Sequence, residues 1–189
     1  MPKLARRGFL KALGWSAAGI PAVAGGATWA LMPVLPPRKG PAVDDAATWI
    51  SLRPDGRFAL LSTRAEMGQG ISMGLKQVAA DELNVDIDRI DLVLPDTSRI
   101  PVARSTVGSD AMRETGPLVA RAAAALSNVI LREAAMRLAR PIATLRIEPA
   151  GVRDGSGTLL SFEALGSGPV LLVTGEEVEA ARPKLVGSR

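Results

Sequence analysis

Two short loops in this chain combine residue types that could bind a ligand. The first, Glu66-Met67-Gly68-Gln69-Gly70, places a carboxylate and an amide around two glycines, which let the backbone approach a bulky group. If a helix begins after Gly70, its first N–H groups would suit an anion, and Gln69 could read a heterocycle edge or a metal-bound oxygen. The alternative is a tight strand–helix turn, which the local pattern alone favours because a short G-x-G is weak evidence.

The second loop is Ser105-Thr106-Val107-Gly108-Ser109-Asp110, in which small hydroxyl residues surround a glycine shortly before a predicted helix. Backbone N–H groups and hydroxyls in such a loop can form a second cradle for an anion. The alternative is an ordinary loop that ends in a helix cap, and local grounds again favour it.

The composition excludes several kinds of catalysis. The 189 residues contain no histidine, no cysteine and no tyrosine. The chain therefore has no disulfide, no thiolate nucleophile, no iron–sulfur ligand and no Ser–His–Asp triad, and a zinc site would need carboxylates alone. Catalysis would need carboxylates, lysine or a bound cofactor. We assign no catalytic residue and no metal ligand in this chain.

The hydrophobic pattern predicts elements that would position both loops, in a fold of the α+β class. Alternating segments 48–52 and 57–62 flank Pro54-Asp55-Gly56, a turn sequence, and predict a β-hairpin. Apolar residues at helical spacing predict a helix over 71–83 and a long helix over about 117–140, with its proline in the first turn.

The remaining elements are shorter. A third strand is predicted over 90–94, and short strands over 145–148 and 158–160 are separated by a glycine-rich turn. Ser161 is expected to cap a short helix that ends at Leu165, and no pattern is clear from Val170 onward. A sheet of three short strands is marginal against two apolar helix faces, so we expect another polypeptide to complete the core.

The first 40 residues differ from the rest. They carry six basic residues and no acid, and residues 12–37 are uncharged. The segment Arg6-Arg7-Gly8-Phe9-Leu10-Lys11 resembles a twin-arginine export signal, which predicts a periplasmic location; the alternative is an ordinary membrane anchor. The 26-residue run would span about 39 Å as a helix, which favours a retained inner-membrane anchor over cleavage after Ala22-Val23-Ala24.

We therefore divide the chain into a leader with linker, 1–40, and a body, 41–189. The net charge of +4 belongs to the leader, because the body carries 17 basic and 19 acidic residues and is slightly acidic. A body of that charge with few aromatic residues does not indicate nucleic-acid binding.

Taken together and in order, the motifs resemble the molybdopterin-binding subunit of the xanthine oxidase family. The likeness is strongest to the isoquinoline 1-oxidoreductase β-subunit and membrane-associated aldehyde dehydrogenase type, and it covers about residues 47–165. The segments that carry it are Trp49-Ile50-Ser51-Leu52-Arg53-Pro54-Asp55-Gly56, Glu66-Met67-Gly68-Gln69-Gly70, Gln77-Val78-Ala79-Ala80-Asp81-Glu82-Leu83, Ile90-Asp91-Leu92-Val93-Leu94-Pro95-Asp96-Thr97 and Thr106-Val107-Gly108-Ser109.

The resemblance implies that this chain binds the molybdenum cofactor, molybdopterin. Gln69 would hydrogen-bond at the molybdenum centre, and Gly68 and Gly70 would permit the close approach. Thr106, Gly108 and Ser109 would contact the pterin or its phosphate. The family's catalytic glutamate and its phenylalanine-glycine-glycine loop correspond to segments that this sequence does not contain.

The resemblance also implies a function and partners. We expect the small N-terminal subunit of a split molybdenum hydroxylase, which oxidises an aldehyde or an N-heterocycle and shares its cofactor with a large molybdopterin subunit. A separate iron–sulfur subunit would carry electrons away, with a c-type cytochrome as an optional further acceptor. The alternatives are a truncated relic and a non-catalytic, exported, membrane-anchored scaffold or interaction protein. The substrate does not follow from the sequence.

Overall fold

The computed structural model describes residues 49–95, 105–107, 110–168, 171 and 173–184. All of them belong to one compact unit, Lys39–Arg189. The expected leader, with its paired arginines, lies outside the described residues, and so do two predicted ligands, Gly108 and Ser109. Within the part of the chain that is described, no helix has both the length and the hydropathy needed to cross a membrane.

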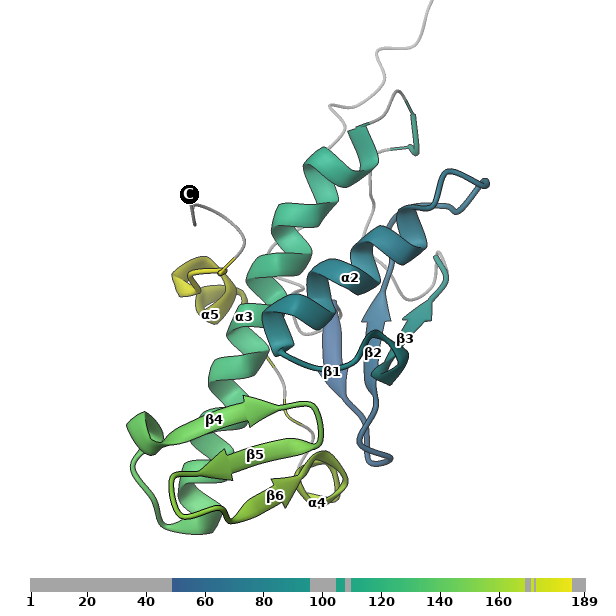
Figure 1. The fold of residues 1–189 in the computed structure, drawn as a ribbon. Helices are drawn as coiled ribbons and strands as arrows, with labels where there is room; N and C mark the ends of the chain where they lie inside the picture. Colours follow the sequence, from purple (N-terminus) through teal and green to yellow (C-terminus); the bar gives the residue numbers. More distant parts are fainter. Residues whose placement is uncertain (1–48, 96–104, 108–109, 169–170, 172, 185–189) are drawn as a thin grey trace, which may run out of the picture. The chain divides into compact units, whose positions relative to one another are not determined.

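The first sheet contains β1 (Ile50–Leu52), β2 (Phe58–Leu61) and β3 (Ile90–Val93) in the order β1-β2-β3. Strands β1 and β2 form the predicted antiparallel hairpin, and Gly56 in its turn has a φ of +74°, which favours glycine. Strand β3 pairs parallel to β2, and parallel neighbours need a crossover connection. That connection contains a helix, labelled α2 (Ile71–Leu83), and the loop before it (Figure 1).

The crossover helix is α2 (Ile71–Leu83), with the bounds that the sequence predicted. Its buried residues recur every four positions, which places one apolar stripe on the core. They include Ile71, Leu75, Ala79 and Leu83. Asn84 ends the helix in a left-handed conformation, with a φ of +54°.

The long helix α3 (Asp110–Leu138) corrects one prediction, because it begins seven residues before Pro117. Pro117 lies inside the helix and has no N–H to bond the carbonyl four residues before it. Because Pro117 is exposed, that unpaired carbonyl is at the surface. The turns before Pro117 are held by tertiary contacts to Arg64, which the local pattern could not reveal. Helix α3 packs beside α2, and the two cover one face of the first sheet (Figure 1).

A second sheet, antiparallel, contains β4 (Leu145–Glu148), β5 (Gly151–Asp154) and β6 (Leu159–Ser161). Strand β5 was missed, since the prediction assigned this segment to the glycine-rich turn. Its Gly151 is required by packing, because a Cβ there would overlap the carbonyl oxygen of Leu160. Strand β4 contacts α3, so this sheet covers part of the long helix.

Two short helices complete the fold. Helix α4 (Phe162–Gly166) has the predicted cap, in which the Ser161 hydroxyl accepts a hydrogen bond from the Ala164 N–H at 3.2 Å. Helix α5 (Gly175–Ala180) was not predicted, although Thr174 and Glu177 form a capping box that is readable as T-x-x-E.

One hydrophobic core joins all these elements. Its members come from both sheets, and the ring of Phe58 in β2 meets that of Phe162 edge to face at 5.1 Å. The described part of the chain thus folds as a mixed α and β protein with two small sheets, as the predicted class requires. The second sheet supplies cover that the sequence assigned to another polypeptide, and completion of the core by a partner stays a prediction.

Candidate functional site

The loop Glu66–Gly70 leads from the end of β2 into α2, and all five of its residues are exposed. Gly68 and Gly70 have φ angles of +88° and +76°, in the left-handed region that other residues avoid. Among the residues that the structure describes, apart from the chain neighbours, a Cβ built at either position meets nothing within 4 Å. Both glycines are therefore needed for the turn itself, and the space in front of them is open.

The Glu66 carboxylate lies at the N-terminus of α2. One oxygen accepts hydrogen bonds from the N–H groups of Gly68, at 2.9 Å, and Gly70, at 3.1 Å, and the other accepts from the Ser72 N–H at 2.9 Å. The bonds from Ser72 and Gly70 lower the pKa of the Glu66 carboxyl to about 2. The sequence left two interpretations open, a helix end that suits an external anion and a tight turn, and the structure places the chain's own carboxylate at this helix end.

The Gln69 side chain bonds within the same loop. Its oxygen accepts from the Met67 N–H at 2.6 Å, and its amide nitrogen donates to the Ala65 carbonyl at 2.8 Å. Neither bond is buried. A ligand that binds this amide therefore replaces a neutral bond to backbone, for which water also competes.

The structure brings the two predicted loops together. The Ala65 N–H donates to the Thr106 hydroxyl at 3.0 Å, and Arg64 donates to the carbonyl of Ser105 at 3.0 Å. The Arg64 side chain is fully buried and also binds the first turns of α3, through Thr115 at 3.0 Å and Glu114 at 2.7 Å. Arg64 was missed by sequence reasoning, because a single arginine after a strand looks like a surface charge.

A pocket of about 320 Å³ opens where the N-terminal turns of α2 and α3 meet. Its lining combines polar loop atoms with apolar helix side chains, from Gln69, Gly70, Ile71, Gly74, Ala111 and Met112. The volume is at the lower end of the range of small-molecule pockets, about 300–1,000 Å³. The Met112 side chain lies between Gly74 and Gly116, with its sulfur 3.5 Å from the Cβ position of each, which is an ordinary contact distance.

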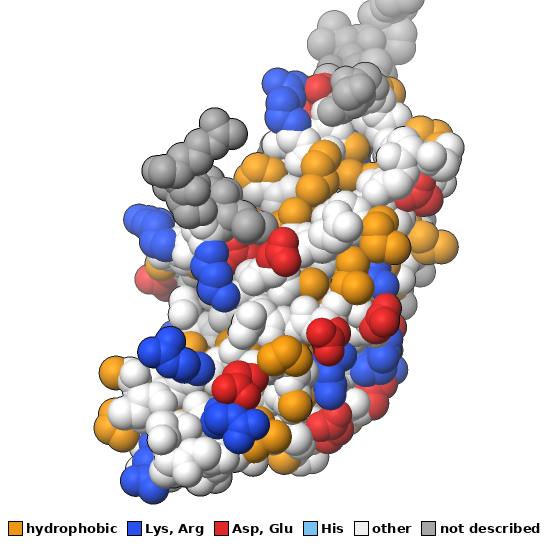
Figure 2. All heavy atoms as spheres, in the orientation of Figure 1, with side chains coloured by type: hydrophobic (Ala, Val, Ile, Leu, Met, Phe, Trp, Pro, Cys, Tyr) orange, Lys and Arg blue, Asp and Glu red, His pale blue; other side chains and the backbone are white. Residues whose placement is uncertain are grey.

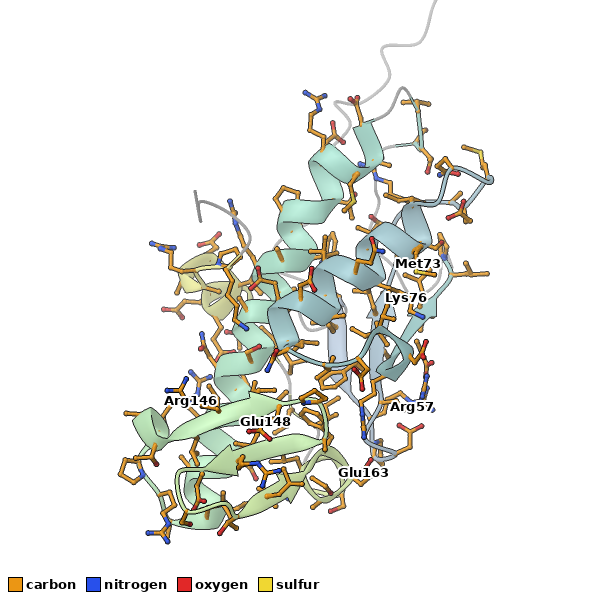
Figure 3. All side chains as sticks on the ribbon, in the orientation of Figure 1. Arg57, Met73, Lys76, Arg146, Glu148 and Glu163 are labelled. Carbon is orange, nitrogen blue, oxygen red and sulfur yellow. The ribbon has the colours of Figure 1, made fainter. Side chains whose placement is uncertain are left out.

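Four of the six predicted ligands can thus be placed, and they lie in one region. Gly68, Gln69 and Gly70 form the first loop, and Thr106 joins it through Ala65. Figure 3 shows Met73 projecting from the first turns of α2. The arrangement offers backbone, hydroxyl and amide groups beside an apolar pocket, which suits a polar heterocycle better than a metal ion alone.

The sequence of this chain is similar to those of known proteins. The family model of the molybdopterin cofactor-binding domain matches residues 5–181. A nicotinate dehydrogenase subunit of Pseudomonas putida is 34% identical over 124 residues, which is 66% of this chain and 10% of that protein. The membrane-bound aldehyde dehydrogenase (pyrroloquinoline-quinone) of Gluconacetobacter polyoxogenes is 32% identical over 90 residues, which is 48% of this chain and 12% of that protein.

The fold is similar to that of a solved structure, CO dehydrogenase from Oligotropha carboxidovorans, with a TM-score of 0.55 at 22% identity. That match covers 62% of this chain and 15% of the other. This chain spans only about a tenth of the length of the two curated relatives, the nicotinate dehydrogenase subunit and the aldehyde dehydrogenase.

Proposed function

Because the chain belongs to the molybdopterin cofactor-binding domain family, within the xanthine oxidase family, we propose that its two joined loops form part of the cradle for a molybdenum cofactor. Gly68, Gln69, Gly70 and Thr106 are the ligands among the described residues. Gly108 and Ser109 continue the second loop and are assigned to the same cradle from the sequence. When bound, this group supplies oxidation and reduction at its metal.

The observation that carries the proposal is the bond from the Ala65 N–H to the Thr106 hydroxyl, which joins the two loops beside the 320 Å³ pocket. The residues present fit a pterin, which is a flat heterocycle with donors and acceptors on its edge. The open space before Gly68 and Gly70 admits close approach to backbone, and the Gln69 amide can exchange its exposed bonds for bonds to such an edge.

The chain's own residues then bind and orient the group. The Thr106 hydroxyl uses an oxygen lone pair for Ala65, and its hydrogen is available to donate to a ligand. Buried Arg64 holds the second loop against the first, so that ligand contacts from both loops keep a constant spacing. No described residue is assigned a proton transfer.

We further propose that another polypeptide supplies the rest of the cofactor site. Exposed apolar side chains around the two loops support this proposal. Among the described residues, most of the large apolar side chains that are exposed lie on or next to the site elements, namely Met67, Met73, Leu94, Val107 and Met112. Figure 2 shows apolar side chains gathered over α2 and the N-terminal half of α3, as a surface for a partner requires.

The proposed enzyme is a molybdenum hydroxylase that oxidises an aldehyde or an N-heterocycle. This chain has no cysteine, so the iron–sulfur clusters would belong to a separate subunit, with a c-type cytochrome as a further acceptor. The twin-arginine-like segment Arg6–Lys11 and the uncharged run after it support export and attachment to the periplasmic side of the inner membrane. The competing proposal is a non-catalytic, membrane-anchored scaffold.

Metal and pterin analysis of the native complex tests the proposal. A tag on the C-terminus of the full chain recovers the complex from its host, and we expect about one molybdenum and one pterin per copy, together with a large subunit. The Gly68→Val variant should be recovered with the same partner and without the cofactor. A native complex with neither molybdenum nor pterin would favour the scaffold.

A further inference from the structure

The carboxylate of Glu66 is the most connected side chain of the first loop. It accepts three backbone hydrogen bonds over six residues, whereas Gly70, the residue that caps α2, has no side chain to contribute. We propose that Glu66 is a positioning residue. Its carboxylate holds the Gly68–Gly70 turn in the backbone conformation that accepts a ligand, before any ligand binds. The nature of the ligand rests on the proposed function, but the order of the turn does not.

The first step of the argument is conformational. A segment with two glycines in the left-handed region has many alternative conformations, so it needs specific contacts to stay in one. Glu66 provides them on the inner side of the turn, through the N–H groups of both glycines. The outer side is open as far as the described residues show, since apart from the chain neighbours none of their atoms lies within 4 Å of either Cβ position.

The second step concerns the helix end. The bond from the Ser72 N–H to Glu66 satisfies a donor of the first turn of α2, and a negative charge there is stabilised by the helix dipole. An external phosphate at this position would have to displace a carboxylate that is already covalently tethered and bound three times. We therefore infer that the cofactor's anionic group binds elsewhere and that Glu66 stays in place.

The third step separates Glu66 from Gln69. Bonds to a charged acceptor are about twice as strong as neutral ones. The two Gln69 bonds are neutral and exposed, so this amide can turn to a ligand at low cost. The loop thus divides its work, because Glu66 keeps the backbone in shape and Gln69 makes the exchangeable contact.

Amide hydrogen exchange on the native complex tests the role directly. In Glu66→Gln, an amide nitrogen replaces one acceptor oxygen and the charge is lost, so exchange at Gly68, Gly70 and Ser72 should accelerate about tenfold or more. Exchange at Ala79, within α2, should not change. Glu179→Gln, which removes an exposed carboxylate from α5, is the charge-matched control and should leave all four amides as they are.

Chemical rescue separates a positioning anion from a packing contact. Glu66 is exposed, so in Glu66→Ala a small carboxylate from solution can reach the vacated site. Formate should slow the exchange of Ser72 again, and chloride at equal ionic strength should not. Unchanged exchange in Glu66→Gln, equal loss of protection along the whole of α2, or no rescue by formate would each overturn the proposal.

Cofactor retention gives the functional readout. The Glu66→Gln complex should lose molybdenum faster than wild type during dialysis, while its partner stays bound. If wild type holds no molybdenum or pterin, the proposed function fails, and the exchange experiment still decides whether Glu66 orders the turn. If wild type holds the cofactor and Glu66→Gln retains it equally well, the role toward the cofactor is wrong.

Discussion

At the scale of single residues, the site combines a side chain whose hydrogen bonds can be exchanged with glycines whose backbone conformation other residues rarely adopt. The Gln69 amide is exposed and bonded only to its own loop, and the adjacent glycines have dihedrals that few residues tolerate. Substitutions at these positions should therefore affect chemistry and cofactor binding differently.

The Gln69→Ala variant should lose turnover while the complex still assembles. Its side chain lies on a loop and outside the core, so packing is preserved. The loss of a hydrogen bond to a charged or polarised centre costs about 1.5–3 kcal/mol, which is about 10- to 150-fold in rate if it is felt in the transition state alone. Steady-state activity per molybdenum, with subunit content as control, measures it. Full turnover in this variant would leave Gln69 a turn residue only.

The Gly68→Val variant should instead lose the cofactor. A β-branched residue resists a φ of +88° and fills the open space in front of the turn. Gly155→Val is a matched control, because Gly155 also faces open space and its φ lies outside the left-handed region. Molybdenum content should fall in the first variant and not in the second. Equal retention in both would contradict the assigned role.

A buried hydroxyl near the site gives a stability prediction. Thr63 is 8% exposed, and its hydroxyl oxygen has no hydrogen-bond partner in the described structure. Burial of an unpaired hydroxyl costs about 1–3 kcal/mol, so Thr63→Val should stabilise the protein by about 1 kcal/mol. Neighbouring Ser62 bonds Arg64 through its hydroxyl, so Ser62→Ala should destabilise by a similar amount.

Thermal or urea unfolding of the purified protein measures both changes. If Thr63→Val destabilises as much as Ser62→Ala, the Thr63 hydroxyl has a partner in the complete complex. A destabilisation seen only in the cofactor-loaded complex would place that partner at the site.

At the scale of elements, the start of α3 depends on one buried side chain. The guanidinium of Arg64 binds Glu114 and Thr115 in the turns before Pro117, where the helix lacks a backbone bond. These contacts come from a residue about fifty positions earlier, so they couple the end of β2 to the first turns of α3.

Removal of that side chain should therefore loosen the first turns of α3. We expect Arg64→Leu to destabilise by about 3 kcal/mol, because it removes the hydrogen bond to the buried Thr115 hydroxyl and the ion pair with Glu114. Arg132→Leu, which breaks an exposed ion pair with Glu177, should cost less than about 1 kcal/mol. Urea unfolding gives the free energies, and hydrogen exchange over 110–116 localises the change. Similar costs for the two variants would show that Arg64 does not hold the helix start.

At the scale of the whole molecule, the leader and the body are expected to act in sequence. A twin-arginine route carries proteins that are already folded, which suits a subunit that assembles around a cofactor before export. The charge distribution fits this order, since all the excess positive charge of the chain lies in residues 1–40.

Replacement of both Arg6 and Arg7 by lysine should block export of the assembled complex. The substitution keeps the charge, so an anchor oriented by positive charge alone would tolerate it. Fractionation of cells that carry the double variant, with molybdenum content measured in each fraction, checks the outcome. Normal delivery to the periplasmic side would count against the twin-arginine interpretation.

The sequence by itself determined the features that depend on local signals. The hairpin over Pro54-Asp55-Gly56, both ends of α2 and the Ser161 cap follow from turn chemistry, periodicity and capping within a few residues, and the structure confirms them. The resemblance also identified the family, which the matching family model confirms. The ligand roles of Gly68, Gln69, Gly70 and Thr106 stay predictions.

Only the tertiary structure decided what depends on contacts between distant segments. The early start of α3 and the joining of the two loops rest on buried Arg64, and strand β5 exists because its neighbours pair with it on both sides. The position of the Glu66 carboxylate at the N-terminus of α2 was also decided by the tertiary structure. A helix N-terminus attracts an anion, and the sequence does not indicate whether that anion is a side chain or a ligand. Burial and hydrogen-bond satisfaction are properties of the assembled chain, and they selected these outcomes over equally plausible local ones.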